Sequence, residues 1–510
     1  MSGVTLGEIF PHAEGFGPWR SALVQGLATD SRRVHPGDLF FGLPGTRTTG
    51  ADFAADALRR GASALVLPRG STPPEGASGI VHPSPYRALA EAAVRFYGDP
   101  GRGMRLAGVT GTNGKTTTAL LVAHLLRADG RRCAYWTTTL VELPGAAFRP
   151  QWTTPPAHEL QRFLRAARDR GEDTSVLEVS SHAVRQERIL GLRFDVGVAT
   201  SFAPDHLDFH PTVEDYYDAK RSFIRGLPQE GAAVLCRDDP KVLAMGQGAR
   251  ARVLTFGEDP GADVRIEGLA QAEGRIEGRL SAQGDGLGAK GSWAFRLGLP
   301  GRHNARNAAA AFAAALWLGV PPEGAARALG TFAGPPRRLE REEIGPFSVY
   351  NDVAMNEASF RAVLETLRDL QPGQAVVVCA LRGNRGAAVN ARIAGILARW
   401  ERELGYAPLI VTESVSELRT YAVDYQVRPE EVAAFRAAAA EGSLELSWHL
   451  ELAPAIEEAV ARLRPGGVLL LLGTFGMDRG PAMARSLLRR RIGLPPAPGE
   501  DYLEPEESGY

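Results

Sequence analysis

The chain has 510 residues, of which 44% are hydrophobic and 23% are charged, and its formal net charge is −1. This is the composition of an ordinary globular protein, and the length corresponds to about three domains. A net charge so close to zero gives no general attraction to nucleic acid or to an anionic membrane, so an anionic ligand must be held by a local site.

The cysteines and the apolar segments indicate the compartment in which the chain works. Cys133, Cys236 and Cys379 lie far apart, show no metal-ligand spacing and cannot all pair in disulfides, which favours a reducing cytosol. The N-terminus lacks the features of a signal peptide, and the most apolar stretch, 468–472, is far too short to span a bilayer. We expect a cytoplasmic monomer that binds neither nucleic acid nor a membrane.

Residues 1–102 carry short strand and helix signals and predict a small α/β N-terminal domain. DLFFGL (38–43) and SALVLP (63–68) have the composition of strands, and an alanine-rich helix between them ends at Gly61. The turn-rich segment GDPGRG (98–103) suits a domain boundary.

Residues 103–336 predict a central domain with a mostly parallel sheet. Apolar strand-like runs alternate here with helical patterns, which is typical of a parallel sheet covered by helices on both faces. The glycine-rich interval from about 272 to 291 predicts a hairpin or an excursion within this domain, and GPPRR (334–338) marks its end. The runs are RLAGVTG (105–111), TSVLEVSS (174–181), FDVGVATSF (194–202) and AAVLCR (232–237).

Residues 337–493 repeat the α/β pattern and predict a C-terminal Rossmann-like domain. Loops that follow strands in such open sheets usually bind ligands. Residues 494–510 are rich in proline and glutamate and have little to bury, so we expect a disordered tail. The predicted strands are QAVVVCA (374–380), APLIVT (407–412) and GGVLLLLG (466–473).

A phosphate-binding loop is the strongest chemical signal in the sequence. Glycines between a strand and a helix let backbone N–H groups face a phosphate, and the helix N-terminus favours negative charge. Lys115 supplies a point charge and Thr116 a hydroxyl for magnesium, although Val109 stands where the long pattern has its first glycine. The loop is Gly111-Thr112-Asn113-Gly114-Lys115-Thr116-Thr117, and we expect it to bind ATP.

Several long segments in order resemble the Mur ligases, the enzymes that build the peptide stem of peptidoglycan. GVTGTNGKTTT (108–118) is similar to their ATP loop, and TDSRRVHPGDLFFGLPG (29–45), with Ser31, resembles the UDP-binding domain of the tripeptide-forming branch, MurE. TTPPAHELQ (153–161) resembles that branch's nucleotide-sugar segment, and residues 177–223 are similar to its metal and substrate core.

The resemblance implies a set of metal and substrate residues. It makes Glu178 and His206 magnesium ligands beside Thr116, and it implies that Lys220 is carbamylated and holds a second magnesium ion. A carbamate requires a neutral amine and therefore a lowered pKa; from the residues alone, Lys220 could be a solvated helix lysine. Arg188 matches an arginine that faces the acidic substrate, although an isolated arginine could equally form a surface ion pair. The substrate set also includes Thr153, Thr154 and Ser180.

Other matches are implied nucleotide contacts. Asn304 and Asn307 match asparagines near the adenine, although asparagine is also common at a helix start. Arg338 and Asp352 match residues that touch the nucleotide from the hinge and the C-terminal domain. Relatives usually have histidine where this chain has Met355, which cannot replace the hydrogen bonds of an imidazole.

The C-terminal domain departs further from the family pattern. Arg382 and Arg385 replace a Gly-Gly-Asp-Arg-Asp loop; they could clamp a phosphate or carboxylate, or be solvated. The Asp-Asn-Pro-Arg motif that recognises diaminopimelate is absent, and the segment 412–417 stands in its place. Within it, Glu413 or Glu417 could accept the side-chain amine of a basic amino acid such as lysine or ornithine.

The predicted activity is that of an ADP-forming, ATP-dependent acid–amino-acid ligase. Through an acyl phosphate, it would add a free amino acid to UDP-N-acetylmuramoyl-L-alanyl-D-glutamate in peptidoglycan synthesis, and so serve cell-wall biogenesis, cell shape and cell division. One alternative is a diverged ligase that uses another acceptor, an amino acid or ammonia, outside the standard step. Another is a nucleotide-binding protein without catalysis.

Overall fold

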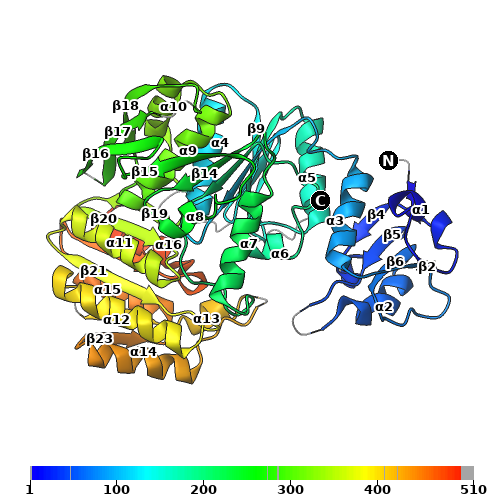
Figure 1. Ribbon diagram of the computed structural model, residues 1–510. Coiled ribbons are helices and arrows are strands. Elements are labelled where there is room, and N and C mark those ends of the chain that lie inside the picture. Colours follow the sequence, from blue (N-terminus) through cyan, green and yellow to red (C-terminus); the bar gives the residue numbers. More distant parts are fainter. Residues whose placement is uncertain are drawn as a thin grey trace.

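The computed structural model describes residues 3–45, 48–272, 274–283, 286–406, 408–421 and 423–495. Figure 1 shows the chain passing from an N-terminal lobe through a large central sheet to a C-terminal lobe. The sheets are mostly parallel and covered by helices, which confirms the predicted α/β class. The predicted disordered tail lies, except for residues 494 and 495, outside the described residues.

The N-terminal lobe is built on a sheet of five strands, parallel except for β2 at one edge. The strands predicted at 38–43 and 63–68 are both present in this sheet, as β5 and β6. In spatial order the strands are β2 (Gly15–Phe16), β7 (Gly79–His82), β6 (Ala64–Pro68), β5 (Asp38–Phe41) and β4 (Gly26–Ala28), with a separate pair β1 (Val4–Thr5) and β3 (Leu23–Val24). The helices are α1 (Leu6–Ile9), α2 (Ala54–Arg59), α3 (Pro85–Tyr97) and the 3₁₀ helices η1 (Trp19–Ser21), η2 (Ser31–Arg33) and η3 (Gly50–Phe53).

The central sheet has a parallel middle and antiparallel edges. From β9 to β16 in spatial order every neighbouring pair is parallel, as predicted, while β10–β11 and β17–β18 extend the edges as hairpins. The glycine-rich interval after residue 272 lies in the second of these edges. The order is β11 (Ala146–Phe148), β10 (Val141–Leu143), β9 (Cys133–Trp136), β12 (Thr174–Glu178), β8 (Arg105–Thr110), β13 (Val196–Ala199), β14 (Ala232–Cys236), β15 (Arg252–Gly257), β16 (Val264–Ala272), β17 (Arg275–Ala282) and β18 (Gly291–Leu297).

Helices pack against this sheet and enclose one large apolar core. Half of the residues of helix α9 are alanine, which lets the helix approach the sheet closely. The helices are α4 (Lys115–Ala128), α5 (Ala157–Asp169), α6 (Ser181–Arg185), α7 (Val213–Arg225), α8 (Pro240–Ala244), α9 (Arg302–Trp317), α10 (Pro322–Ala328) and η4 (Leu329–Thr331).

The C-terminal lobe is a sheet of six strands between two helical layers, each with its own apolar core. The apolar run predicted to be a buried strand is β24, in the interior of this sheet. The order is β19 (Arg338–Ile344), β20 (Phe347–Asp352), β24 (Val468–Leu472), β21 (Ala375–Ala380), β22 (Leu409–Thr412) and β23 (Leu446–His449). The helices are α11 (Glu357–Leu370), α12 (Ala387–Leu404), α13 (Val415–Leu418), α14 (Pro429–Glu441), α15 (Leu452–Arg462), α16 (Gly480–Arg491) and η5 (Phe475–Met477).

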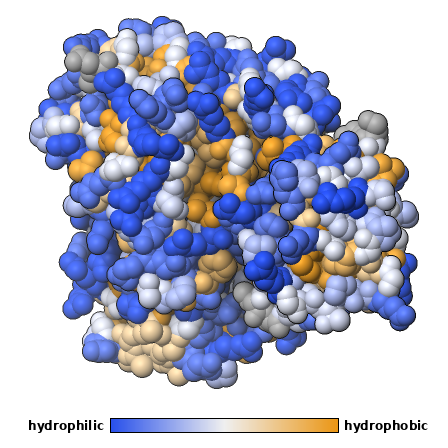
Figure 2. Space-filling model, turned by 45° about the vertical axis from the view of Figure 1, so that its right-hand side comes forward, coloured by the Kyte–Doolittle hydropathy of each residue, from blue (hydrophilic) through white to orange (hydrophobic). Residues whose placement is uncertain are grey.

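The face of the molecule drawn in Figure 2 is mostly hydrophilic. In the view of Figure 2, hydrophobic residues gather in the middle of the face and are bordered by hydrophilic ones. Among the helices of the described ranges, none combines the length and the apolar composition that a membrane crossing requires.

The order of three neighbouring strands positions the candidate site. Strands β12, β8 and β13 are adjacent and parallel, so their carboxyl ends lie side by side. Glu178 ends β12, the phosphate loop follows β8, and the segment with His206 follows β13. Ligands of open α/β sheets usually bind at this edge.

Candidate active site

The phosphate loop leaves β8 and enters helix α4 at Lys115, as the sequence predicts. Gly111 and Gly114 have φ angles of 141° and 86°, a region that side chains rarely adopt. A Cβ atom at Gly114 would collide with Asn307 Oδ1, and one at Gly111 would collide with Thr200 Oγ1. Both glycines are therefore required by backbone conformation and by the close approach of neighbouring side chains.

Lys115 lies across the mouth of this loop. Its Nζ donates to the carbonyl oxygens of Gly111 (3.0 Å) and Thr112 (2.9 Å). Burial lowers the pKa of Lys115, an effect that the carboxylate of Glu178 opposes. Thr116 and Thr117 follow in the first turn of α4, and both are buried. The loop thus combines a positively charged side chain, a helix N-terminus and a hydroxyl, which suits a nucleotide phosphate with its magnesium ion.

The segment that follows β13 supports the loop from the side. Thr112 Oγ1 donates to Ala203 O (3.0 Å) and lies 3.1 Å from the hydroxyl oxygen of Tyr216. Asn113 N donates to Ser201 Oγ (3.0 Å), and Thr200 Oγ1 donates to Asn113 O (2.5 Å). These supporting residues were not predicted, because nothing in the local sequence pairs positions about ninety residues apart.

Three of the predicted magnesium ligands bind without chemical modification. They are the hydroxyl of Thr116, the carboxylate of Glu178 and the imidazole of His206. Glu178 is almost fully buried, and its carboxylate accepts from Thr138 N (2.6 Å) and Thr138 Oγ1 (3.1 Å). Burial lowers the pKa of His206 to about 4, so the ring is neutral at pH 7, the form that binds metals.

These donors suit a magnesium ion that is shared with phosphate. Oxygen ligands and an occasional imidazole are what such an ion takes from a protein, and it usually keeps waters and substrate phosphates as its other ligands. Within the described part of the chain, no three His, Cys, Asp or Glu side chains are placed to hold a metal ion by themselves. Thr116, Glu178 and His206 remain the predicted magnesium ligands of this site.

Lys220 is fully enclosed rather than solvated. It shares one face of α7 with Tyr216 and Phe223, at helical spacing, so the packing of that face buries the lysine. Its Nζ donates to Gly111 O (2.6 Å) and lies 4.6 Å from the centre of the Tyr216 ring. Burial, and then the nearby charge of Lys115, place the pKa of Lys220 well below its usual value. The alternative of a solvated helix lysine is therefore wrong.

The predicted adenine asparagines lie inside helix α9 next to the phosphate loop. The N-cap of α9 is Gly301, so neither asparagine is the cap of this helix. Asn307 Oδ1 accepts from Thr118 Oγ1 (3.3 Å), and Asn307 Nδ2 donates to Asn304 Oδ1 (3.2 Å). Both side chains are buried.

Two further predicted nucleotide contacts are paired across the hairpin of β19 and β20. Arg338 is in register with Asp352, whose carboxylate accepts from Leu339 N (2.9 Å). Burial raises the pKa of Asp352 to about 6, although the charge of Arg338 opposes this. The charge of Arg338 also contributes to the lowered pKa of Lys115, which places this arginine within electrostatic reach of the phosphate loop.

The predicted substrate residues of the central domain form one connected group beside Glu178. Thr154 Oγ1 donates to Glu178 O (2.7 Å) and lies 3.2 Å from Ser180 Oγ. Arg188 Nη1 donates to Thr154 O (2.5 Å), and Thr138 Oγ1, which also donates to Glu178, is 3.1 Å from Thr153 Oγ1.

The surroundings of Arg188 and Ser31 differ from those of Thr154. Arg188 donates to neutral oxygens of Thr154 and Gln186, and its guanidinium is half-buried, which is not the surface ion pair that was the alternative. Ser31 stands apart: it is buried at the start of η2 in the N-terminal lobe.

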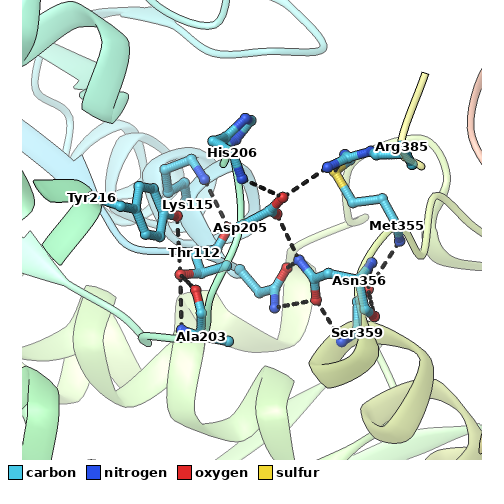
Figure 3. Close-up of polar contacts among 11 residues, drawn as sticks. Thr112, Lys115, Ala203, Asp205, His206, Tyr216, Met355, Asn356, Ser359 and Arg385 are labelled. Carbon is cyan, nitrogen blue, oxygen red and sulfur yellow. Dashed lines mark hydrogen bonds and ion pairs between the residues drawn. The ribbon is translucent and has the colours of Figure 1, made fainter. Parts of the chain in front are cut away.

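The C-terminal lobe reaches the phosphate loop through Asn356 and Arg385 (Figure 3). Asn356 and Asn113 exchange two amide hydrogen bonds of 3.1 and 3.2 Å, and Asn356 Nδ2 also donates to Asp205 Oδ2 (3.0 Å). Arg385 Nη1 lies 2.7 Å from Asp205 Oδ1 in an ion pair that is almost buried. Burial alone would raise the pKa of Asp205, but Arg385 and then His206 hold it near 2. The sequence alone assigned no separate role to Asp205 or to Asn356.

A buried glutamate organises the loop that carries Arg385. Glu431, at the start of α14, accepts from the backbone N–H groups of Arg385 (3.2 Å), Gly386 (2.8 Å) and Arg428 (2.9 Å). Its position in the sequence gave no reason to expect this role.

A pocket lies behind this loop, at the carboxyl end of β21. The guanidinium of Arg382 lies 4.9 Å from the ring centre of Tyr425 and 5.1 Å from that of Phe475. The Nε groups of Arg382 and Arg385 are buried and make no hydrogen bond within the described chain, so both keep a donor for an anionic ligand. The pocket is lined by Ala354, Met355, Phe360, Cys379, Ala380, Leu381, Arg382, Arg385, Asn390, Ile393 and Thr474.

The two glutamates proposed for a basic side chain are already partly engaged. Glu413 Oε1 accepts from Trp448 Nε1 (2.8 Å), and Glu417 Oε1 accepts from Arg479 Nη1 (3.1 Å). Neither belongs to the lining of the pocket that contains Arg382 and Arg385. The structure therefore does not bring Glu413 together with the predicted arginine clamp.

Three family models match successive parts of the chain. They are "Mur ligase family, catalytic domain" over residues 23–97, "Mur ligase middle domain" over 109–315 and "Mur ligase, glutamate ligase domain" over 337–475.

Curated relatives and solved structures agree with these models. A protein from Gloeobacter violaceus named UDP-N-acetylmuramoyl-L-alanyl-D-glutamate–2,6-diaminopimelate ligase is 36% identical over 77% of this chain and 78% of its own length. A Geobacter metallireducens protein of the same name is 34% identical over 88% and 89%. A solved structure with that name covers 96% of this chain and 99% of its own, with a TM-score of 0.68 and 24% identity. MurF from Acinetobacter baumannii covers the same shares, with a TM-score of 0.70 and 19% identity. At these identities the solved structures are evidence for the fold alone.

Proposed function

This chain belongs to the Mur ligase family of ATP-dependent, ADP-forming ligases, and from that premise we propose that it adds a free amino acid to UDP-N-acetylmuramoyl-L-alanyl-D-glutamate. The observation that supports the proposal is that the predicted nucleotide, metal and substrate residues lie together at the phosphate loop. Lys115 and the buried Lys220 both donate to Gly111 O, while Glu178 ends the neighbouring strand. In the substrate group, Thr154 donates to Glu178 O, and Arg188 donates in turn to Thr154 O. Nucleotide, metal and acidic substrate can therefore meet at one sheet edge.

The chemistry proceeds in two steps that these residues can support. A carboxylate oxygen of the donor attacks the γ-phosphorus of ATP, the bond to the β-phosphate oxygen breaks, and ADP leaves an acyl phosphate. Lys115 neutralises negative charge that develops on the transferred group. The acceptor amine then attacks the acyl carbon; it loses a proton, and phosphate departs with one oxygen of the original carboxylate. Magnesium, when bound at Thr116, Glu178 and His206, supplies further neutralisation of the phosphate oxygens.

Exclusion of water is a second requirement, because water would hydrolyse the acyl phosphate. Asn356 and Arg385 join the C-terminal lobe to Asn113 and Asp205 beside the phosphate loop. Asn356 and Asp205 are buried, and Asn113 and Arg385 are partly buried, so the contact covers the loop on that side.

The acceptor is proposed to bind in the C-terminal pocket. The free Nε donors of Arg382 and Arg385 suit the carboxylate of an amino acid, because guanidinium groups bind carboxylates with charge-assisted hydrogen bonds. Glu413 follows the neighbouring strand β22 and lies outside the lining of this pocket, so it would meet only the far end of an acceptor with a long basic side chain, such as lysine or ornithine. The relatives are named for diaminopimelate, but the segment 412–417 of this chain differs from the motif that recognises it.

The test is to supply the full-length protein with ATP, magnesium, the UDP-linked dipeptide and one amino acid at a time. We expect phosphate release that depends on both donor and acceptor, and a product heavier by one amino-acid residue. Joining only uncharged amino acids would contradict a role of Glu413 in selecting the acceptor. Phosphate release without any amino acid would favour another acceptor, such as ammonia, and absence of ATP binding would favour a non-catalytic protein.

We also propose that Lys220 is carbamylated in the working enzyme. A neutral amine attacks carbon dioxide and loses a proton to give an anionic carbamate, and the buried, low-pKa Lys220 favours the neutral amine. Lys220 lies beside Lys115, so a negative charge there would be compensated and could hold a second magnesium ion.

This proposal predicts that activity depends on dissolved carbon dioxide. In buffer freed of carbon dioxide, we expect the rate to fall and to return when bicarbonate is added. Lys220→Ala should be about 10- to 100-fold slower, which is the usual cost of losing a group that supports a metal, and should not respond to bicarbonate. An intact-mass measurement that finds no added carbon dioxide, with a rate indifferent to bicarbonate, would refute carbamylation.

A further inference from the structure

The largest aromatic side chain at the substrate group has no assigned role. Trp152 precedes the pair Thr153-Thr154, and 45% of its surface is exposed. Buried tryptophans such as Trp19, Trp136 and Trp400 are at most 7% exposed. A large exposed aromatic residue beside a polar site is more informative than an exposed aliphatic one, since its flat face can serve as a binding surface.

Trp152 is held in place by two contacts. Its backbone carbonyl accepts a hydrogen bond of 3.0 Å from Nε1 of the buried Trp136, which anchors the main chain to the core. The guanidinium of Arg188 lies 5.1 Å from its ring centre, a cation–π distance. Arg188 is itself fixed by its bonds to Thr154 and Gln186. The ring is thus positioned before any ligand arrives, although nearly half of it is open to solvent.

A continuous line of contacts joins the N-terminal lobe to Glu178 and passes the Trp152 ring. Tyr86, on α3, donates to Pro44 O (2.6 Å) in the N-terminal lobe and accepts from Gln186 Nε2 (3.3 Å). Gln186 accepts from Arg188, Arg188 donates to Thr154, and Thr154 donates to Glu178 O. The Trp152 ring packs against the guanidinium of Arg188, which lies midway along this line.

We propose that the Trp152 ring packs against the sugar ring of the UDP-linked donor. This inference rests on the proposed function, which puts the reacting carboxylate near Glu178, and on the expectation from the sequence that the UDP end binds the N-terminal lobe. The muramoyl sugar connects those two ends and therefore lies between them. One face of a pyranose ring consists of C–H groups, which pack on an aromatic ring while the hydroxyl and amide groups remain hydrated. Arg188 occupies part of the tryptophan and leaves its exposed part for the sugar.

The experiment compares Trp152→Ala and Trp152→Phe with the wild-type protein in steady-state kinetics. For Trp152→Ala we expect the KM of the donor to rise about tenfold, with kcat and the KM of ATP nearly unchanged, because a contact kept throughout the reaction affects binding alone. Trp152→Phe keeps an aromatic face and should recover most of the affinity. Leu450→Ala is the matched control, since Leu450 is 61% exposed in the C-terminal lobe; it should change neither constant.

A binding titration identifies the part of the donor that is recognised. Trp152→Ala should weaken UDP-N-acetylmuramic acid about tenfold and leave UDP itself unchanged. Equal loss for both ligands, or an unchanged donor KM, would overturn the assignment of Trp152 to the sugar. A rise in every KM, or a lowered melting temperature, would assign Trp152 a structural role and overturn it as well. If the wild-type protein forms no product from this donor, the proposed function fails, which is a distinct outcome.

Discussion

Lys115→Ala should reduce ATP-dependent phosphate release by at least about 10²- to 10³-fold, the usual cost of removing one group that neutralises charge in a transition state. Lys115 Nζ lies at the centre of the phosphate loop, bonded to Gly111 O and Thr112 O. Alanine removes this charge without altering the glycines that shape the loop. The measurement is single-turnover phosphate release with donor and acceptor saturating, accompanied by a nucleotide titration that separates binding from chemistry.

Lys241→Ala is the matched control for this prediction. Lys241 is an exposed lysine of helix α8 in the same domain, so its removal changes the net charge equally. It should leave the rate unchanged. A Lys115→Ala protein that remains folded and keeps more than a tenth of the wild-type rate would contradict the assignment of the phosphate loop.

Arg385→Ala should lower kcat by about 10²-fold or more, because it leaves the buried carboxylate of Asp205 without its partner. Removing one member of a buried ion pair costs about 3–5 kcal/mol. Arg385 and Asp205 belong to different lobes, and their side chains are only 13% and 5% exposed. The substitution therefore weakens the contact between the C-terminal lobe and the segment beside the phosphate loop. Loss of an acceptor contact at Arg385 would add to the effect.

A double-mutant cycle separates these two contributions. If the ion pair is what matters, Asp205→Asn and Arg385→Ala combined should cost clearly less than the sum of the single changes. Arg392→Ala is the control, since it breaks the exposed pair of Arg392 with Glu357 and should have little effect. Strict additivity of the two changes at Asp205 and Arg385 would show that the pair does not couple the lobes during turnover.

The sequence predicted the structure correctly where a motif consists of neighbouring residues. The strand before the phosphate loop, the glycines and Lys115 all follow from one short segment, and the structure has them as predicted. The parallel middle of the central sheet also follows from alternating strand and helix patterns. The edge hairpins β10–β11 and β17–β18 were harder to predict from the sequence, because the hydrophobic periodicity of short strands with glycines and mixed polarity is weak.

Contacts between distant segments could not be predicted from the sequence. Asn113 and Asn356 are separated by 243 positions, and only the docking of two lobes brings their amides together. The sequence identified Met355 as a departure from the family pattern, but not that its Sδ lies 3.4 Å from Arg385 Nη2. The burial of Lys220 likewise depends on the packing of α7 against the phosphate loop, which a single helix does not reveal.

In the proposed reaction the donor carboxylate is activated as an acyl phosphate at the loop that carries Lys115. A decisive experiment uses a donor whose D-glutamyl carboxylates are labelled with heavy oxygen, incubated with ATP and the accepted amino acid. We expect the released phosphate to carry one heavy oxygen and the new amide to retain the other oxygen of the same carboxylate. Unlabelled phosphate formed together with an amide product would refute the acyl phosphate, because the carboxylate would then have been activated by another route.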